Sequence, residues 1–561
     1  MNLPPRSRAD DARPALGWVL GAAALIYLIA VYCSLRGVNF GNHPDEWRVL
    51  KAVEDSFRSG IFLQRWYEWG SLGYDIGAIT AVLSYLTRGA AHDAIVQTVN
   101  LAAMEPPVGY FKQHGDFNLL VRSIDATISL LIVFPVAHLT WRLTKQLWPS
   151  ILAAIVVGLS FQLNYHSRWY VGDALMMMFG FLSVYLAVVY LQSNRRFSWV
   201  WLASSAIAAA VSAAAKYTGG MFLIAPALAV ALKAVVQTSA QWPAIRLRVP
   251  RVAGEWAICA FAFGLTFVLL NPAVLVEPFV FVSNLKHMQQ LYANGVGTNQ
   301  DVTSRPENVL LSLLFTFLAA PSQYSMLSPI VLLLFCAGFW ELRRNPVEGL
   351  ILVLPFALFF FLLSWQKVFV ARNLLPMLPF VAVVCGCGAA SLLDAWPKFR
   401  YVLPALCLVF LAANGSYLWL SARQINKMTT QQELAEMRDY IAQRPATVFS
   451  IDKSVPDKDR EFLGLPNARP FVDASSMGDF VAIDANAFRN LVGVERRHCS
   501  TNRPGLYTVF GPRDSTFDYY TAMIGGGRYV VMSRNTFQQV LEQKPFDGLI
   551  CWPLMALRWE Y

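Results

Sequence analysis

Long apolar runs divide the first three quarters of the chain into predicted membrane helices. An α-helix needs about 20 predominantly apolar residues to cross the hydrocarbon core of a bilayer. Runs of this kind lie at 16–34, 118–140, 148–165, 171–192, 198–214, 218–236, 252–275, 324–342, 348–365, 372–393 and 401–420. The pattern predicts about 11 transmembrane helices and an all-α polytopic membrane protein. The apolar stretch 70–88 carries Asp75 and several hydroxyl side chains, so we expect it to lie in the membrane interface.

The pattern changes after residue 420. An amphipathic helix is predicted at 429–443, and short strands and a last helix are predicted at 446–451, 469–472, 528–532 and 534–542. We therefore expect a transmembrane domain over 1–420, with interfacial helices in its first outer loop at 35–117, and a small extracytoplasmic α/β domain over 421–561. The glycines of this tail do not form G-x-G-x-x-G, so no nucleotide site is predicted.

Composition supports a membrane protein. Apolar residues make up 56% of the chain and charged residues 15%, and the mean hydropathy is +0.42. Soluble domains carry roughly 25% charged residues, so a water-soluble, fibrous or disordered chain is excluded. The net charge is +10, but residues 421–561 hold 17 basic and 16 acidic residues, so nearly all of the excess lies among the apolar spans. This distribution is typical of positive-inside loops and predicts no nucleic-acid partner.

The basic residues between the spans fall on one side of the membrane when the N-terminus is placed inside. They are Arg142 and Lys145, Arg195 and Arg196, Arg246, Arg248 and Arg251, Arg343 and Arg344, and Lys398 and Arg400. The positive-inside rule makes this side cytoplasmic and places 35–117, 276–307 and the tail outside. We expect a bacterial inner membrane, with a periplasmic C-terminal domain, and leave a eukaryotic endoplasmic reticulum as the alternative. The basic residues before the first span would also suit a signal peptide. No small-residue cleavage site follows the span, however, so we expect it to stay uncleaved.

The 8 cysteines show no metal-binding spacing. Cys385 and Cys387 lie inside an apolar run and are expected to be small buried side chains. Cys499 and Cys551 lie in the tail, where a disulfide between them and two free thiols are both open interpretations.

The first outer loop begins with an acidic pair. After the first span the chain reads Asn42-His43-Pro44-Asp45-Glu46-Trp47 and continues into a short amphipathic helix. Proline and acidic residues also suit the first turn of any helix, which is the purely structural explanation. At a membrane surface, however, a carboxylate can take a proton from a soluble acceptor while a lipid-borne substrate enters from the side.

Several charged residues lie at membrane level on the same outer side. They are Arg122, Asp125, His166, Arg168, Asp173, Lys216 and Arg372. Charges at this depth are costly and usually face a cavity, although a single cation can also extend toward lipid headgroups. Carboxylates grouped with cations suit a phosphate leaving group.

These segments resemble the GT-C superfamily of membrane-embedded glycosyltransferases. The matching segments, in the order of the family, are Asp45-Glu46, Tyr165-His166-Ser167-Arg168 with Asp173, Ala215-Lys216-Tyr217-Thr218-Gly219, Asn271-Pro272 with Glu277-Pro278, and Ala371-Arg372-Asn373-Leu374-Leu375-Pro376 with Leu378-Pro379. They cover roughly residues 16–393 and are most similar to the protein O-mannosyltransferase and lipid A aminoarabinose transferase type. Two positions depart from the family: Tyr67-Glu68-Trp69-Gly70 stands where Tyr-Pro-Pro is common, and Asn373 stands where tyrosine is common.

The resemblance implies an inverting transfer of a sugar from a polyprenyl-phosphate donor to an acceptor on the extracytoplasmic face. In this interpretation Asp45 is the general base, and Glu46 orients the acceptor or holds the loop. The leaving phosphate is bound by Arg168, Lys216 and Arg372. The further site candidates are His43, Glu68, Arg122, His166, Asp173 and Tyr217, with His166 expected to be a structural partner of its loop.

The sequence is compatible with several acceptors. A protein serine or threonine, a lipopolysaccharide and a cell-wall glycan all fit the acceptor side. His43 beside carboxylates leaves a divalent metal open, but no firm ligand spacing predicts one.

Three other protein classes fit the sequence less well. A lipid or sugar transporter would need internal repeats and charges near the bilayer midplane, whereas these charges cluster at the outer edge. A non-catalytic membrane protein with a ligand-binding tail would not need about 11 spans. A phosphoethanolamine transferase or polysaccharide ligase would need a threonine nucleophile with metal ligands, or a large outer loop with other basic residues. The sequence favours the glycosyltransferase.

Overall fold

The computed structural model describes most of the membrane region and short parts of the tail. The described residues are 12–36, 38, 49, 52–53, 55–56, 70–87, 115–169, 171–193, 197–237, 242–295, 302, 304–322, 324, 326–427, 438–439, 442–443, 449–451, 469–470, 478–484, 508–509, 529–535 and 538. They divide into two compact units, one formed by 1–35, 48–92 and 120–418, the other by 36–47, 93–119 and 419–561.

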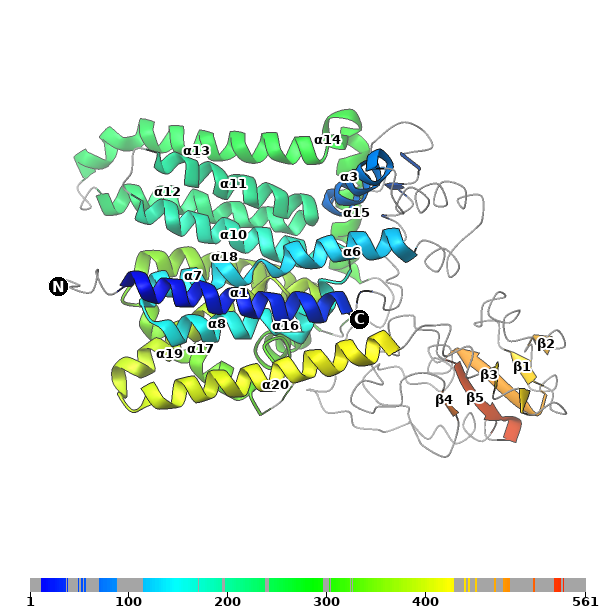
Figure 1. Ribbon diagram of the computed structural model, residues 1–561. Coiled ribbons are helices and arrows are strands. Elements are labelled where there is room, and N and C mark those ends of the chain that lie inside the picture. Colours follow the sequence, from blue (N-terminus) through cyan, green and yellow to red (C-terminus); the bar gives the residue numbers. More distant parts are fainter. Residues whose placement is uncertain are drawn as a thin grey trace. The chain divides into compact units, whose positions relative to one another are not determined.

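The first unit is a bundle of apolar helices (Figure 1). Its helices, apart from residues 36, 115–119 and 419–427, which belong to the second unit, are α1 (Ala12–Arg36), α3 (Leu72–Thr87), α6 (Gly115–Leu130), α7 (Val133–Thr144), α8 (Leu147–Gly158), α9 (Phe161–His166), α10 (Asp173–Gln192), α11 (Ser198–Ala215), η1 (Tyr217–Leu223), α12 (Ile224–Gln237), α13 (Trp242–Leu270), α14 (Ala273–Val276), α15 (Pro278–Asn294), α16 (Arg305–Leu314), the π-helical η2 (Phe315–Ala319), α17 (Ser328–Leu342), α18 (Pro346–Ser364), η3 (Ala371–Leu374), α19 (Met377–Ala395) and α20 (Phe399–Lys427).

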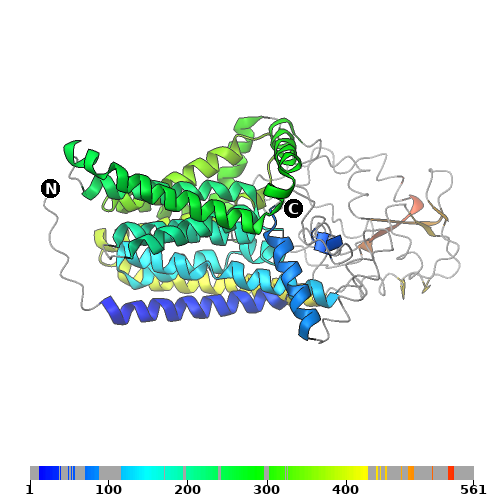
Figure 2. The same ribbon diagram turned by 90° about the horizontal axis from the view of Figure 1, so that it is seen from above.

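Among the described residues, 9 helices are long and apolar enough to cross a membrane. They correspond to nine of the predicted spans, and the remaining two, at 148–165 and 324–342, appear as the shorter apolar helices α8 and α17. The predicted all-α polytopic membrane protein is confirmed. The stretch 70–88 forms α3, which lies at one end of the bundle, across the direction of the long helices (Figures 1 and 2). Its place in the membrane interface stays a prediction.

Helix α19 is enclosed by other helices of the bundle. All residues from Met377 to Ser391 are buried, including Cys385 and Cys387. Gly338 of α17 packs directly on α19, because a methyl group there would lie 2.6 Å from Val384 Cγ1. Small residues at such crossings let helix backbones approach closely, which is how helices associate in lipid.

Polar contacts join four of the predicted basic connections at one end of the bundle. Arg142 Nε donates to Gln192 Oε1 (2.8 Å), and Gln192 Nε2 donates to Glu348 Oε1 (3.1 Å). Arg344 forms an ion pair with Asp394. These contacts link the α7–α8, α10–α11, α17–α18 and α19–α20 connections, so these four connections lie at one end of the bundle, where the topology places them.

The described part of the tail contains a five-stranded sheet. Its strands are β1 (Phe449–Ile451), β2 (Arg469–Pro470), β3 (Phe480–Asp484), β4 (Thr508–Val509) and β5 (Tyr529–Ser533). The order is β2-β1-β3-β5-β4, with β1 parallel to β2 and β3, and β5 antiparallel to β3 and β4. Strands β1, β2 and β5 lie at predicted positions, whereas β3 and β4 were missed. The predicted helix at 429–443 falls largely outside the described residues, so the small α/β domain stays a prediction.

Candidate active site

Three helix ends bring the charged residues together. Gly172 adopts a left-handed backbone (φ 84°) and lets α10 begin at Asp173, whose carboxylate suits the positive end of the helix dipole. Lys216 follows the last residue of α11, where the chain leaves the helix in an extended conformation (φ −156°, ψ 132°). Arg372 and Asn373 lie in the single turn η3, directly before α19.

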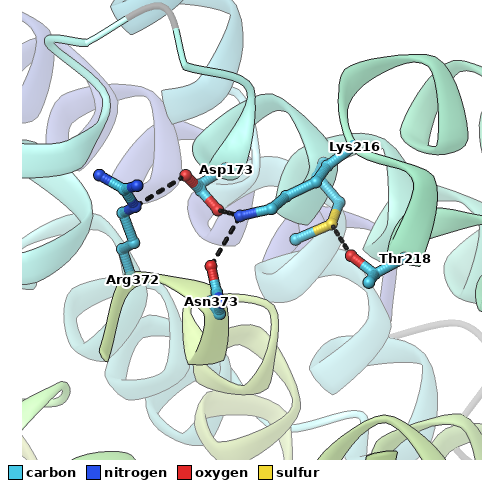
Figure 3. A network of polar contacts seen from close by, with 6 residues as sticks. Asp173, Lys216, Thr218, Arg372 and Asn373 are labelled. Atoms are coloured by element: carbon cyan, nitrogen blue, oxygen red, sulfur yellow. Dashed lines mark hydrogen bonds and ion pairs between the residues drawn. The ribbon is translucent and has the colours of Figure 1, made fainter. Parts of the chain in front are cut away.

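These ends form a network around one buried carboxylate (Figure 3). Lys216 Nζ lies 2.6 Å from Asp173 Oδ1, and Arg372 Nε lies 3.6 Å from Asp173 Oδ2. Lys216 Nζ also donates to Asn373 Oδ1 at 2.6 Å. The carboxylate therefore has a cation on each oxygen and fixes the separation of the two cations.

The network can bind an anion. The side chain of Asp173 is 1% exposed, whereas those of Lys216 and Arg372 are 16% and 17% exposed, so the cations and not the carboxylate reach the solvent side. Two cations and one carboxylate leave a net positive charge. Since an ammonium has three N–H donors, Lys216 keeps one after its bonds to Asp173 and Asn373.

His166 is buried beside this network as a neutral side chain. It is 3% exposed, and neither ring nitrogen has a hydrogen-bond partner in the described part of the chain. Burial lowers the pKa of His166 to about 3, and the charges of Arg372 and Lys216 also lower this pKa, against the charge of Asp173. The ring packs edge-on against Tyr165 at 4.9 Å, which supports a structural role.

Arg168 is directed to α1 rather than to the Asp173 network. It is 1% exposed, and its Nη2 donates to the carbonyl oxygen of Cys33 at 3.5 Å. The neighbouring Ser167 hydroxyl lies 3.3 Å from that of Ser34. Cys33 is in the last turn of α1, where carbonyl groups lack helical partners and favour a cation. Lys216 and Arg372 are thus brought together, and Arg168 contacts a different helix end.

Two further candidates take part in packing. The Arg122 guanidinium lies over the Trp169 ring, 4.5 Å from its centroid, and is 2% exposed. Tyr217 packs edge-on against Phe281 at 5.4 Å and against Phe267 at 6.5 Å. Both residues support the structure close to the candidate site.

The predicted catalytic pair lies outside the described residues. This is true of Asp45 and Glu46, and also of His43, Glu68, Cys499 and Cys551. Their roles stay predictions. Within the described residues, no group of three or more His, Cys, Asp or Glu side chains could hold a metal ion.

Sequence reasoning missed two residues that shape the network. Asn373 was noted only as a departure from the family, although it directly follows Arg372. The neighbouring positions Arg372 and Asn373 do not reveal, as a sequence, that the Asn373 amide oxygen accepts from Lys216. Gly172 was also missed, although a glycine before an acidic residue at a helix start is a recognisable signal.

Comparison with known proteins gives one family match and several structural likenesses. Residues 106–287 match the family model described as dolichyl-phosphate-mannose-protein mannosyltransferase. No curated protein matches the chain. Similar solved structures include ArnT from Cupriavidus metallidurans bound to undecaprenyl phosphate, with 13% identity and a TM-score of 0.48, covering 92% of this chain and 98% of that chain. The apo state of ArnT matches with 13% identity and a TM-score of 0.49, over 93% and 98%.

A third structure is the archaeal oligosaccharyltransferase AglB from Archaeoglobus fulgidus, in complex with an inhibitory peptide and a dolichol-phosphate. It matches with 11% identity and a TM-score of 0.46, over 88% of this chain and 73% of that chain. The matched family segment contains His166, Asp173 and Lys216. Over residues 106–287 the chain is therefore similar to the dolichyl-phosphate-mannose-protein mannosyltransferase family, as its motifs predict.

Proposed function

We propose that the protein is an inverting glycosyltransferase that moves a sugar from a polyprenyl-phosphate donor to an acceptor on the extracytoplasmic face of the membrane. The observation that carries this proposal is the cationic network of Asp173, Lys216 and Arg372 at the ends of apolar helices. Such a network suits a phosphate attached to a lipid chain that lies between the spans. The family match over residues 106–287 supports the sugar-transfer chemistry.

The network stabilises the leaving group. A polyprenyl-phosphate sugar is a phosphodiester with one negative charge, and the leaving phosphate gains a second charge as the bond to the sugar breaks. Lys216 and Arg372 are already held in place by Asp173, so they need little reorganisation when this charge develops. A charge-assisted contact of this type contributes about 1.5–3 kcal/mol.

Asp45 is the proposed general base. It takes the proton of the acceptor hydroxyl or amine while the acceptor atom bonds to the anomeric carbon. The bond between this carbon and the phosphate oxygen breaks on the opposite side, and the phosphate keeps the electron pair. Attack opposite the leaving group inverts the anomeric configuration. Glu46 orients the acceptor or holds the loop.

The topology supports an extracytoplasmic site. Helix α10 has 20 residues and starts at Asp173, so it runs about 30 Å from the network to Gln192. Gln192 contacts Arg142 at the basic end of the bundle, which the positive-inside rule assigns to the cytoplasm. The proposed location is a bacterial inner membrane, with the N-terminus in the cytoplasm and the tail in the periplasm.

The test is a turnover assay on purified protein in nanodiscs. The protein is mixed with a panel of polyprenyl-phosphate sugars and cell-extract acceptors, and free polyprenyl phosphate is measured by mass spectrometry. We expect release by the wild type, at least a hundred-fold less release by Asp45→Asn, and normal release by the control Asp394→Asn. Asp394 is a half-exposed carboxylate at the basic end of the bundle, away from the site. Release at the wild-type rate by Asp45→Asn would refute the base assignment, and no release with any donor would refute the proposed transfer.

A further inference from the structure

The end of α11, directly before Lys216, is in close contact with two glycines. A methyl group at Gly70 would overlap the Ala214 carbonyl oxygen and lie 2.5 Å from its carbonyl carbon and 2.8 Å from that of Ala215. A methyl group at Gly172 would overlap the Ala215 carbonyl oxygen and lie 3.1 Å from its carbonyl carbon. Gly172 belongs to the start of α10 and so to the network already described. Gly70 belongs to a different part of the chain, the middle of the first outer loop, just before α3.

A second contact fixes the same part of the loop. The Ser71 hydroxyl donates to the carbonyl oxygen of Leu270, the last residue of α13. The Ser71 carbonyl accepts a hydrogen bond from Asp75 N (2.8 Å), which opens α3. Residues 70 and 71 are therefore attached to the ends of two spanning helices, and α3 starts from this attachment.

Helix α3 also contacts Val53 and Ser56, which follow the acidic pair in the sequence. The Tyr74 hydroxyl lies 2.7 Å from the Ser56 hydroxyl, and both side chains are buried. A methyl group at Gly77 would lie 3.1 Å from Val53 Cγ2, so α3 and this segment are closely packed. A continuous series of contacts thus runs from Val53 and Ser56 through α3 to Gly70 and the base of Lys216.

We propose that Gly70 is a positioning residue that holds α3, and with it Val53 and Ser56, at a fixed distance from the phosphate-binding cations. The proposal rests on the proposed function and names a residue for which that function has no assignment. Any larger side chain at position 70 must move the start of α3 or the α11 end, because all three contact atoms are backbone. Ordinary contact with a methyl group starts at 3.4 Å, so the carbonyl carbon at 2.5 Å alone requires a shift of about 1 Å, and the closer carbonyl oxygen requires more.

The first test is steady-state kinetics of Gly70→Ala in nanodiscs. We expect kcat to fall roughly ten- to a hundred-fold, because a misplacement of about 1 Å can cost that much in rate, while KM for the donor changes less than about two-fold. Gly172→Ala is the contrasting variant, since it displaces Asp173 and should raise KM for the donor. Gly254→Ala is the matched control, because a methyl group there meets no atom within 4 Å.

A second readout does not depend on activity. Hydrogen exchange of the first turn of α3, including the Asp75 amide, should become faster in Gly70→Ala and stay unchanged in Gly254→Ala. Ser71→Ala replaces Gly70→Ala in this test if the latter does not fold. It removes the hydrogen bond to Leu270 without adding bulk, and it should also make exchange faster and lower kcat. Wild-type kcat with wild-type exchange, or equal changes in kcat and KM, would overturn the proposal. Absence of turnover in the wild type would instead contradict the proposed function, and the exchange comparison would still test Gly70.

Discussion

Replacing Lys216 with methionine separates the structural from the ligand-binding part of the Asp173 network. Methionine keeps the unbranched shape of the side chain, one heavy atom shorter, and removes its charge. In the variant, Asp173 loses its contact at 2.6 Å and keeps only Arg372 at 3.6 Å. The carboxylate is 1% exposed, so solvent cannot replace the lost partner. Two effects follow, one on the stability of the fold and one on the binding of phosphate.

The two effects have different expected sizes. Removing one member of a buried ion pair costs about 3–5 kcal/mol, but Lys216 is partly exposed and Arg372 remains, so we expect a loss of about 1–3 kcal/mol in stability. Loss of one charge-assisted contact to the leaving phosphate costs about 1.5–3 kcal/mol, which is roughly a ten- to 150-fold fall in kcat/KM.

A double variant distinguishes these effects. Asp173→Asn combined with Lys216→Met removes the carboxylate charge that has lost its lysine partner. Compared with Lys216→Met alone, the double variant should therefore recover part of the stability, measured as Tm in detergent. It should not recover kcat/KM, because the cation is still absent. Lys398→Met, at the opposite end of the bundle, is the control for removing a lysine. If the double variant regains wild-type turnover, Lys216 serves only to neutralise Asp173, and its role as a phosphate ligand is refuted.

Three further predictions concern the surroundings of the site. Arg168→Met should lower Tm through the lost contact with the α1 end, and should reduce kcat/KM less than Lys216→Met does; the reverse order would restore Arg168 as a donor ligand. For His166, burial lowers the pKa from 6.5 to about 3, so the folded state binds fewer protons than the unfolded state, and stability should be lost as pH falls from about 6.5 toward 3. His166→Phe should flatten this dependence in a Tm-against-pH series, and an unchanged slope would contradict the neutral buried histidine. Lys398→Cys should react with a membrane-impermeant maleimide only in inverted vesicles, and labelling in intact cells would reverse the topology.

The membrane spans were predictable because each is a continuous segment of the sequence. A run of about 20 apolar residues is visible in the sequence whatever it packs against. Two helices are shorter than their apolar runs for local reasons. After α8 ends at Gly158, Ser160 caps a new helix, α9, and α17 begins at Ser328 with a proline in its first turn. Strands β3 and β4 were missed because two to five residues carry too little periodicity to be recognised without their partners.

The charged network was predictable only in part. Asp173, Lys216 and Arg372 were selected because charges at membrane level are costly, and the helix ends do bring them together. Arg168 was grouped with them by the same rule, yet its guanidinium reaches α1, because sequence position does not indicate which neighbouring helix end a long side chain meets. Asn373 and Gly70 act through a single amide oxygen and through the absence of a side chain, and neither property stands out in a sequence.

The binding of lipid phosphate tests the central claim most directly. Native mass spectrometry of the purified protein would compare polyprenyl phosphate with the polyprenol of the same chain length, for the wild type, Lys216→Met, Arg372→Met and the control Lys398→Met. We predict that the wild type and the control retain the phosphate lipid at least ten-fold more tightly than the alcohol, and that each site variant loses most of this preference. Equal binding of the two lipids by the wild type, or an undiminished preference in both site variants, would contradict a phosphate site at Asp173, Lys216 and Arg372.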